Sequence, residues 1–420
     1  MRLPLSLSLP LPFPLYLLSL AVFAMGTSEF MLAGLLPAIA ADLDITVGTS
    51  ATLTSAFAAG MVVGAPLMAG FARNWPRRSA LLGFVGVFAA AHAVAAVTSS
   101  FPLLVATRVV AALANAGFLA VALTAAATLV APDRKGRALA VLLSGTTAAT
   151  IAGVPGGALL GAVFGWRATF WAVAALCVPA ALGILRGIPA TTVRVPHTQP
   201  PSSPTPSTSP SLRSELAELR RPGLVRVMVV GALVNAATFA SFTFLAPVVT
   251  GTAGLGDLWV PVALVLFGAG SFAGVTVAGR LADRYPGRTL ATGGPLLLLG
   301  WPALAVLAEH PWPLLGLVLV QGALSFAVGS TLITRILYEA PGAPTMAGSY
   351  ATAALNTGAT TGPLLAAPTL TTPLAALGPL WTSAALVATA LLIALPYGAV
   401  VRRGAVLRHG ARRGTPAPRA

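Results

Sequence analysis

Apolar runs long enough to cross a lipid bilayer recur about twelve times along this chain, since one such helix needs roughly 20 apolar residues. Hydrophobic residues make up 56% of the 420 positions and charged residues only 8%. In lipid every backbone polar group must bond within its own segment, so each run is expected to be helical. The predicted fold is an all-α polytopic membrane protein, with spans at 15–39, 49–72, 79–98, 101–130, 136–163, 167–188, 223–250, 258–280, 288–308, 311–338, 344–367 and 378–401.

The net charge of +15 is concentrated in alternate gaps between the predicted spans. Basic residues cluster after spans two, four, six and eight and in the tail, whereas the intervening gaps hold almost none except Arg167. Positively charged loops stay on the cytoplasmic side, so the alternation predicts an even number of spans with both termini cytoplasmic. We assign this charge to orientation and to contact with anionic membrane lipids, not to nucleic-acid binding.

A segment rich in Pro, Ser and Thr divides the chain into two halves. Residues 189–222 lack apolar periodicity and are predicted to form a flexible cytoplasmic linker. The linker separates an amino-terminal six-helix half, 15–188, from a carboxyl-terminal six-helix half, 223–401. A cytoplasmic arm, 1–14, precedes the first half, and a basic cytoplasmic tail, 402–420, follows the second.

The two halves repeat each other at a constant offset of 210 residues. Matching pairs across two spans and the following loop are Pro37 and Pro247, Phe57 and Phe267, Gly60 and Gly270, Gly64 and Gly274, Ala72 and Ala282, and Pro76 and Pro286. A duplicated six-helix unit favours a substrate site between the halves and a rocking alternation of access.

Glu29 is a carboxylate inside the first predicted span. At a helical rise of about 1.5 Å per residue it lies on the order of 15 Å from the nearer end. A charge at that depth costs several kcal/mol and is usually retained to carry protons, ions or substrate. Glu29 is therefore the candidate proton carrier, and the alternative is a structural carboxyl bonded to a neighbouring helix.

Arg108 is the second charge inside a predicted span. It lies about 10 Å from the external end of span four, a depth close to that of Glu29, which allows a direct or water-bridged pair. The alternative is an arginine that extends to the membrane surface. His92 on span three is expected to pack against or bond a neighbour.

Four sequence segments resemble the major facilitator superfamily. The loop GRLADRYPGR at 279–288 and its partner AGFARNWPRR at 69–78 resemble the loop signature of that superfamily. The span-five segment SGTTAATIAGVPGGALLG resembles the motif of its drug:proton antiporter branch, and MGTSEFMLAGLLPAIAADL narrows the resemblance to bacterial chloramphenicol exporters. Arg73 stands where the general signature has Asp, which puts the usual charge relay of that loop in doubt, whereas the second half keeps Asp283.

The resemblance assigns roles to several groups of residues. It implies proton coupling through an acid in span one and a buried arginine in span four, which correspond to Glu29 and Arg108. It implies a cytoplasmic loop motif formed by Arg73, Arg77, Arg78, Asp283, Arg284 and Arg288. It also implies that the span-five motif of Gly153, Pro155, Gly157 and Gly161 seals the closed pathway; by itself, the stripe equally suits ordinary close packing of helices.

Spans four, seven and ten carry polar and aromatic residues at helical spacing. In the superfamily, spans one, four, seven and ten line the central cavity, so the implied substrate contacts are Asn115, Asn235, Phe239, Phe242, Gln321 and Ser325. Phe239 is the repeat partner of Glu29, which places an aromatic ring opposite the acid. Polar residues in membrane helices often just hold helices together, and that alternative stays open for each.

The chain lacks the motifs of the common enzyme chemistries. It has no phosphate-binding G-x-x-x-x-G-K-[ST] segment, and four scattered His with one Cys predict no metal site. We therefore expect no enzyme activity and no cofactor, with the proton gradient as the driving force. The expected partners are a small-molecule drug, protons and membrane lipids, with no nucleic acid, and the chain is expected to work as a monomer.

The first functional hypothesis is a proton-coupled antiporter in the bacterial plasma membrane that exports a neutral amphiphilic antibiotic. Chloramphenicol is the favoured substrate. A second hypothesis keeps the fold and makes the cargo a sugar or another metabolite, which requires more hydrogen-bonding side chains in the cavity. A third is a membrane receptor or assembly factor without flux, and Glu29 together with the span-five motif argues against it.

Overall fold

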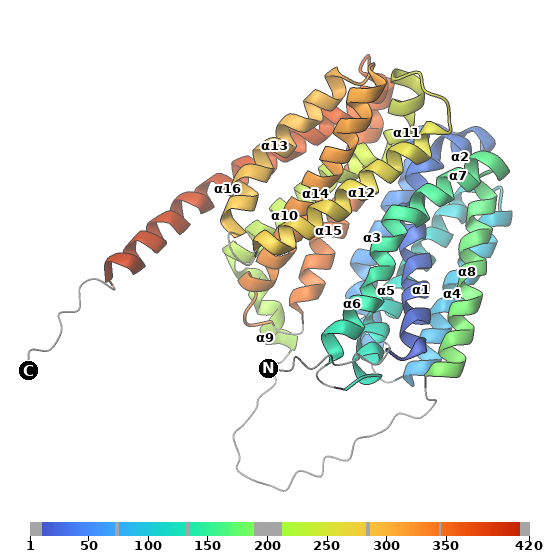
Figure 1. The fold of residues 1–420 in the computed structure, drawn as a ribbon, viewed down its shortest axis with the longest axis horizontal. Helices are drawn as coiled ribbons and strands as arrows, with labels where there is room; N and C mark the ends of the chain where they lie inside the picture. The colour runs from blue at the N-terminus through green and yellow to red at the C-terminus, as the bar shows by residue number, and fades with distance from the viewer. Residues whose placement is uncertain are drawn as a thin grey trace, which may run out of the picture.

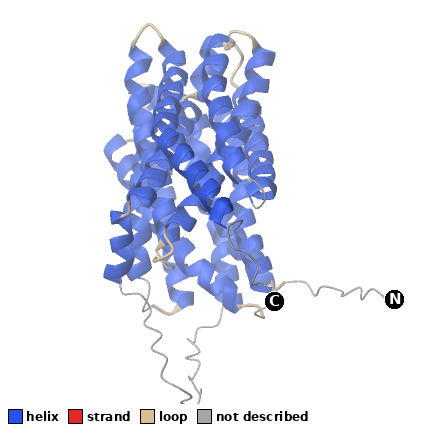
Figure 2. Cartoon of the chain, turned by 90° about the vertical axis from the view of Figure 1, so that its left-hand side faces the viewer, coloured by secondary structure: helices blue, strands red, loops and turns tan. Residues whose placement is uncertain are grey.

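The computed structural model describes residues 11–71, 75–131, 134–188, 212–282, 286–343 and 346–411. Within these ranges the chain is helical, with short connecting turns and no strand. Figure 1 shows two helical bundles side by side, and Figure 2 shows most helices running lengthwise between two loop-bearing ends. Residues 1–10 of the predicted arm (1–14), residues 189–211 of the predicted linker (189–222) and residues 412–420 of the predicted tail (402–420) lie outside the described residues.

The first bundle contains α1 to α8. Its first span is interrupted by a 3-10 turn, and its fifth by a π-helical turn. The elements are α1 (Phe13–Phe30), the 3-10 turn (Met31–Gly34), α2 (Leu36–Asp42), α3 (Val47–Phe71), α4 (Arg77–Val97), α5 (Phe101–Thr128), α6 (Lys135–Ala148), the π-helical turn (Ala149–Gly153), α7 (Val154–Phe164) and α8 (Trp166–Gly187).

The second bundle contains α9 to α16, and its first span is interrupted at the position equivalent to the break in α1. The elements are α9 (Leu212–Ala217), a 3-10 turn (Glu218–Arg220), α10 (Pro222–Thr243), α11 (Leu245–Pro247), a π-helical turn (Val248–Thr252), α12 (Trp259–Ala282), α13 (Pro286–Val306), α14 (Pro311–Glu339), α15 (Ala347–Ala366), two 3-10 turns (Ala367–Thr371 and Ala375–Leu377) and α16 (Gly378–Ala411).

Each predicted span coincides with one helix or with two consecutive helices, which confirms the all-α polytopic fold. In the described part of the chain, eleven helical segments are long and apolar enough to cross a membrane. The remaining predicted span is α15, whose 20 residues include several Thr and an Asn. It is covered by protein because it packs between α10 and α3.

The two bundles meet along α3 and α15 and along α7 and α12. We call the end where α8 stops and α10 starts the linker end, and the opposite end, where α2 turns into α3, the far end. At the far end Gly48 contacts Ala367 and Gly34 faces Leu264. Near mid-length Ala58, Phe239 and Ala359 form a small buried cluster that joins the bundles.

The carboxyl end of the predicted linker is docked against the second bundle. Glu215 on α9 is 2% exposed, and its carboxylate accepts a hydrogen bond of 2.8 Å from the backbone N–H of Met346. The hydroxyl of Tyr350 donates to the backbone oxygen of Glu215 at 2.7 Å. A negative charge at the amino end of a helix is favourable, so α9 holds the start of α15 in place.

The sequence repeat has a direct counterpart in helix packing. On α3, a Cβ added at Gly60 would meet Ala112 of α5 at 2.7 Å. On α12, a Cβ at the repeat partner Gly270 would run into the backbone carbonyl of Leu319 on α14. Glycine at these positions lets the paired helices approach closely, so both halves use the same device to close their bundles.

We expect Gly270→Ala to lower the thermal unfolding temperature in detergent. Alanine in place of glycine inside a helix ordinarily stabilises it by about 1 kcal/mol, but here the added methyl group meets a fixed backbone carbonyl. Gly316→Ala on α14, which faces open space, is the matched control and should be neutral or stabilising. Equal behaviour of the two variants would contradict the packing argument.

Candidate functional site

A buried arginine organises the centre of the first bundle. Arg108 on α5 is 1% exposed, so it does not extend to the surface. Its guanidinium donates to the backbone oxygen of Ser28 at 2.7 Å and to the Ser28 hydroxyl at 2.8 Å. The guanidinium carbon lies 4.5 Å from the centre of the Phe57 ring, where the negative face of the ring stabilises the cation.

Glu29 is half-buried beside this arginine. Arg108 and Glu29 interact electrostatically, but within the described residues no hydrogen bond or ion pair engages the Glu29 carboxylate. The arginine is held instead by the residue that precedes Glu29. The arrangement keeps a fixed positive charge near a carboxyl group that has no partner of its own.

His92 on α4 extends the network around Arg108. Its Nδ1 lies 2.8 Å from the backbone oxygen of Phe88, and its Nε2 lies 2.7 Å from the Ser28 hydroxyl. A carbonyl only accepts, so Nδ1 carries the proton and Nε2 of the neutral ring accepts from Ser28. The Ser28 hydroxyl therefore accepts from Arg108 and donates to His92. This contact agrees with the expectation that His92 bonds a neighbour. The neighbour is Ser28, the residue that also anchors Arg108.

An aromatic cluster joins the two bundles. Its member in the first bundle is Phe30, the residue that follows Glu29 in the chain. Phe30 lies 5.8 Å from Phe239 and 6.3 Å from Phe242, measured between ring centres. The Phe242 ring lies 4.8 Å from Phe267, which lies 6.2 Å from Phe326. These rings line a pocket together with residues of α7 and α12.

The polar residues implied to contact substrate do not line this aromatic pocket. Asn235 donates to the backbone oxygen of Leu355 on α15 at 2.7 Å, and Gln321 donates to Leu297 on α13 at 3.3 Å. Asn115 and Ser325 are 2% and 3% exposed and do not line the aromatic pocket.

The structure thus brings Phe239 and Phe242 together at the interface and turns Asn235 and Gln321 towards neighbouring helices. Gln321 lines a smaller pocket beside the aromatic one, which shares Phe242 and Phe267 with it.

The glycine stripe of span five faces the first span. A Cβ at Gly153 would collide with Thr27, one at Gly157 would lie 3.5 Å from the Cβ of Met31, and one at Gly161 would collide with Leu35. Proline cannot donate a backbone hydrogen bond, and a π-helical turn lies directly ahead of Pro155. The stripe therefore fixes the position of the helix that carries Glu29.

The loop motif is described only in part. Arg77 and Arg288 are exposed, and Arg78 is half-buried, all at the linker end. Arg73, Asp283 and Arg284 lie outside the described residues.

Reasoning from the sequence missed Ser28, Phe57 and Phe30 as members of the site. Ser28 and Phe30 flank Glu29 directly, so their places in the chain gave a usable signal. Phe57 was noted only as the repeat partner of Phe267, and nothing in the sequence pattern places its ring against Arg108.

We expect His92→Phe to destabilise the protein by about 1–3 kcal/mol, because the Ser28 hydroxyl loses its buried acceptor. His92→Gln, which offers a carbonyl oxygen, should recover part of the loss. The measurement is thermal unfolding in detergent, with His310→Phe at the exposed start of α14 as the control. Wild-type stability of His92→Phe would show that the Ser28–His92 bond does not support Arg108.

Comparison with known families gives a consistent match. The sequence model of the Major Facilitator Superfamily matches residues 18–363. The chain is 70% identical over 387 residues, 92% of its length and 96% of the relative, to a chloramphenicol resistance protein of Streptomyces lividans. It is 31% identical over 341 residues, 81% of its length and 84% of the relative, to the inner membrane transport protein YdhP of Escherichia coli K12.

Solved structures share the fold at low sequence identity. A bacterial homologue of the human lysosomal transporter Spinster, in an inward-facing and unoccupied conformation, superposes with a TM-score of 0.70 at 16% identity. The match covers 90% of this chain and 96% of that one. The human organic anion transporter MFSD10 gives a TM-score of 0.59 at 21% identity, covering 90% of this chain and 97% of that one.

Proposed function

Because the chain belongs to the Major Facilitator Superfamily, a family of membrane transporters, we propose that it exports chloramphenicol or a closely related neutral antibiotic in exchange for protons. The observation that carries the substrate is the 70% identity to a chloramphenicol resistance protein along 92% of the chain. In this proposal the protein lies in the bacterial plasma membrane, works as a monomer and has both termini in the cytoplasm. It works as a transporter and not as an enzyme, and it needs no cofactor.

The aromatic pocket supports a site for an aromatic, amphiphilic substrate. Phe30 belongs to the first bundle, and Phe239 and Phe242 belong to the second, so a molecule between these rings contacts both halves. Stacked aromatic pairs contribute about 0.5–1.5 kcal/mol beyond area burial. The hydrogen bond of Asn235 to α15 weakens the sugar hypothesis, because a sugar needs such groups free in the cavity.

Glu29 supports the proton half of the exchange. Its carboxyl group is half-buried, and within the described residues no hydrogen bond or ion pair engages it, so it is free to take up and release a proton. Arg108 is held by Ser28, so in this proposal it keeps its position while Glu29 gains and loses its proton. Because Glu29 and Phe30 are adjacent, a substrate that enters the aromatic pocket changes the surroundings of the Glu29 carboxyl group. Substrate binding and protonation of Glu29 therefore compete.

Alternating access requires that the bundles part at one end at a time. The contacts of Gly48 with Ala367 and of Gly34 with Leu264 join the bundles at the far end. The fold similarity to a transporter in an inward-facing conformation agrees with closure at that end. Opening to the outside must break these contacts.

We expect Glu29→Gln to abolish proton-coupled export. In proteoliposomes with an internal pH indicator, chloramphenicol should drive proton movement through the wild type and not through the variant. Glu309→Gln, which neutralises an exposed carboxylate at the far end, is the matched control. Drug-driven proton movement in Glu29→Gln would move the proton site elsewhere, and no movement with the wild type would overturn the chloramphenicol assignment.

We expect Phe239→Ala to raise the chloramphenicol concentration for half-maximal transport by about 2- to 10-fold, as the loss of one or two ring contacts implies. Phe272→Ala removes a 50% exposed ring from α12 and serves as the control. Transport rates measured over a range of drug concentrations separate a change in binding from a loss of folded protein. Equal effects of the two substitutions would remove Phe239 from the substrate site.

A further inference from the structure

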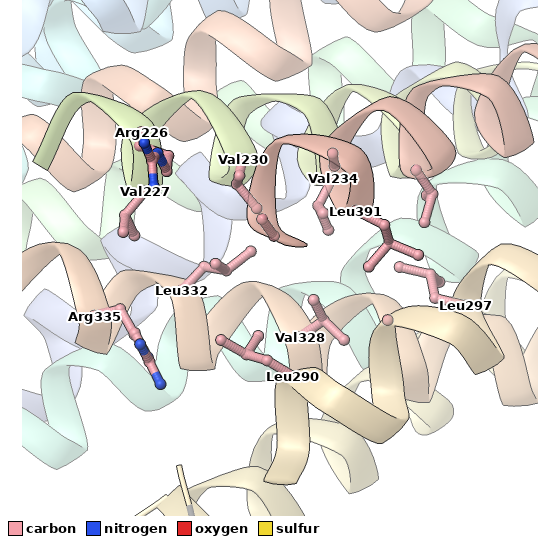
Figure 3. A pocket seen from close by; sticks show the side chains of 14 residues that line it. Arg226, Val227, Val230, Val234, Leu290, Leu297, Val328, Leu332, Arg335 and Leu391 are labelled. Carbon is pink, nitrogen blue, oxygen red and sulfur yellow. The ribbon is translucent and has the colours of Figure 1, made fainter. Parts of the chain in front are cut away.

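The second bundle contains an apolar crevice that is separate from the aromatic pocket. It lies between α10, α13, α14 and α16, is partly open to the surroundings, and contains a cavity of about 90 Å³. Its walls include Val230, Val234, Leu297, Val328 and Leu332, and Figure 3 shows these side chains pointing into it from the surrounding helices. It shares no lining residue with the aromatic pocket.

Two arginines stand at one end of this crevice. Arg226 on α10 and Arg335 on α14 are its only polar lining residues, and every other lining residue is apolar or glycine. Figure 3 shows both arginines at the same end of the row of apolar side chains, on two different helices. Arg226 is half-buried and makes no hydrogen bond or ion pair within the described residues.

Both arginines lie close to the linker end of their helices. Arg226 is the fifth residue of α10, and Arg335 is the fifth from the end of α14, so both lie about 6 Å inside the linker end of their helices. The crevice continues from there towards the middle of the helices. On the outer surface nearby, Val229 is 40% exposed and Leu392 is 68% exposed, as expected for side chains that face lipid.

We propose that this crevice binds one anionic phospholipid, with an acyl chain between the helices and the phosphate at Arg226 and Arg335. Basic pockets between membrane helices on one side of the bilayer are suited to anionic headgroups. The apolar walls match a hydrocarbon chain, which a free phosphate lacks. The crevice offers no aromatic ring on which an aromatic drug could stack.

The test measures lipid retained by the purified full-length protein. The protein in detergent is mixed with phosphatidylglycerol and phosphatidylcholine of identical chains, and bound lipid is counted by native mass spectrometry. We expect a several-fold excess of phosphatidylglycerol on the wild type. Arg226→Gln and Arg335→Gln should each reduce that excess several-fold, whereas Arg220→Gln, an exposed arginine at the same end, should leave it unchanged.

A second pair of variants tests the acyl-chain half of the site. Val230→Phe fills the crevice and should reduce the binding of both lipids, whereas Val229→Phe, on the outer face of α10, should not. If Val230→Phe does not fold, Leu332→Phe takes its place on the opposite wall.

Equal retention of the two lipids, or an excess that survives both arginine substitutions, would overturn the headgroup assignment. Unchanged binding in Val230→Phe or Leu332→Phe would overturn the crevice. If glycerol phosphate competes as strongly as the intact lipid, the crevice is an anion site and not a lipid site. If chloramphenicol displaces the lipid, the crevice is a drug site. These readouts are binding measurements, so they are independent of whether the protein exports chloramphenicol.

Discussion

The burial of the Arg108 cation is the constraint on which the centre of the first bundle depends. Removing a charge from water costs several kcal/mol unless hydrogen bonds and opposite charge compensate. Ser28 supplies two acceptors, Phe57 supplies a ring face, and Glu29 supplies a nearby negative charge. These residues come from α1 and α3, and His92 of α4 holds the Ser28 hydroxyl, so one cation ties four helices together.

The two halves share their backbone packing and differ in their chemistry. The offset of 210 residues carries α3 onto α12 to within two residues at each end, and it carries the close glycine contact of Gly60 onto that of Gly270. The same offset carries Glu29 onto Phe239 and Phe57 onto Phe267. The charged cluster in one half thus corresponds to an aromatic cluster in the other, and the two clusters meet where Phe30 contacts Phe239.

The sequence was sufficient for the fold because hydropathy, loop charge and the repeat depend only on residue type and spacing. The sequence also predicts roles for Glu29, Arg108, Phe239 and Phe242, and the structure places Arg108 beside Glu29 and both phenylalanines in one aromatic cluster. The sequence could not give the partner of Arg108, because Ser28 and Glu29 point about 100° apart on the same helix and apolar surroundings do not reveal which one faces α5. For the same reason the contacts of Asn235 and Gln321 with neighbouring helices could not be foreseen.

In the exchange of drug for protons that we propose, the position of α1 would let the substrate and the proton influence each other without any rearrangement of the buried cation. Arg108 holds α1 through Ser28, and the glycine stripe of span five holds it through Thr27, Met31 and Leu35. Both contacts lie within the first bundle, so the rigid-body rocking that we propose would leave them intact. The contact of Phe30 with Phe239 crosses between the bundles, so a substrate that enters the aromatic pocket must separate these two rings. Glu29 lies between Ser28 and Phe30 in the chain, so its carboxyl group stands between the contact that holds Arg108 and the contact that crosses to the second bundle.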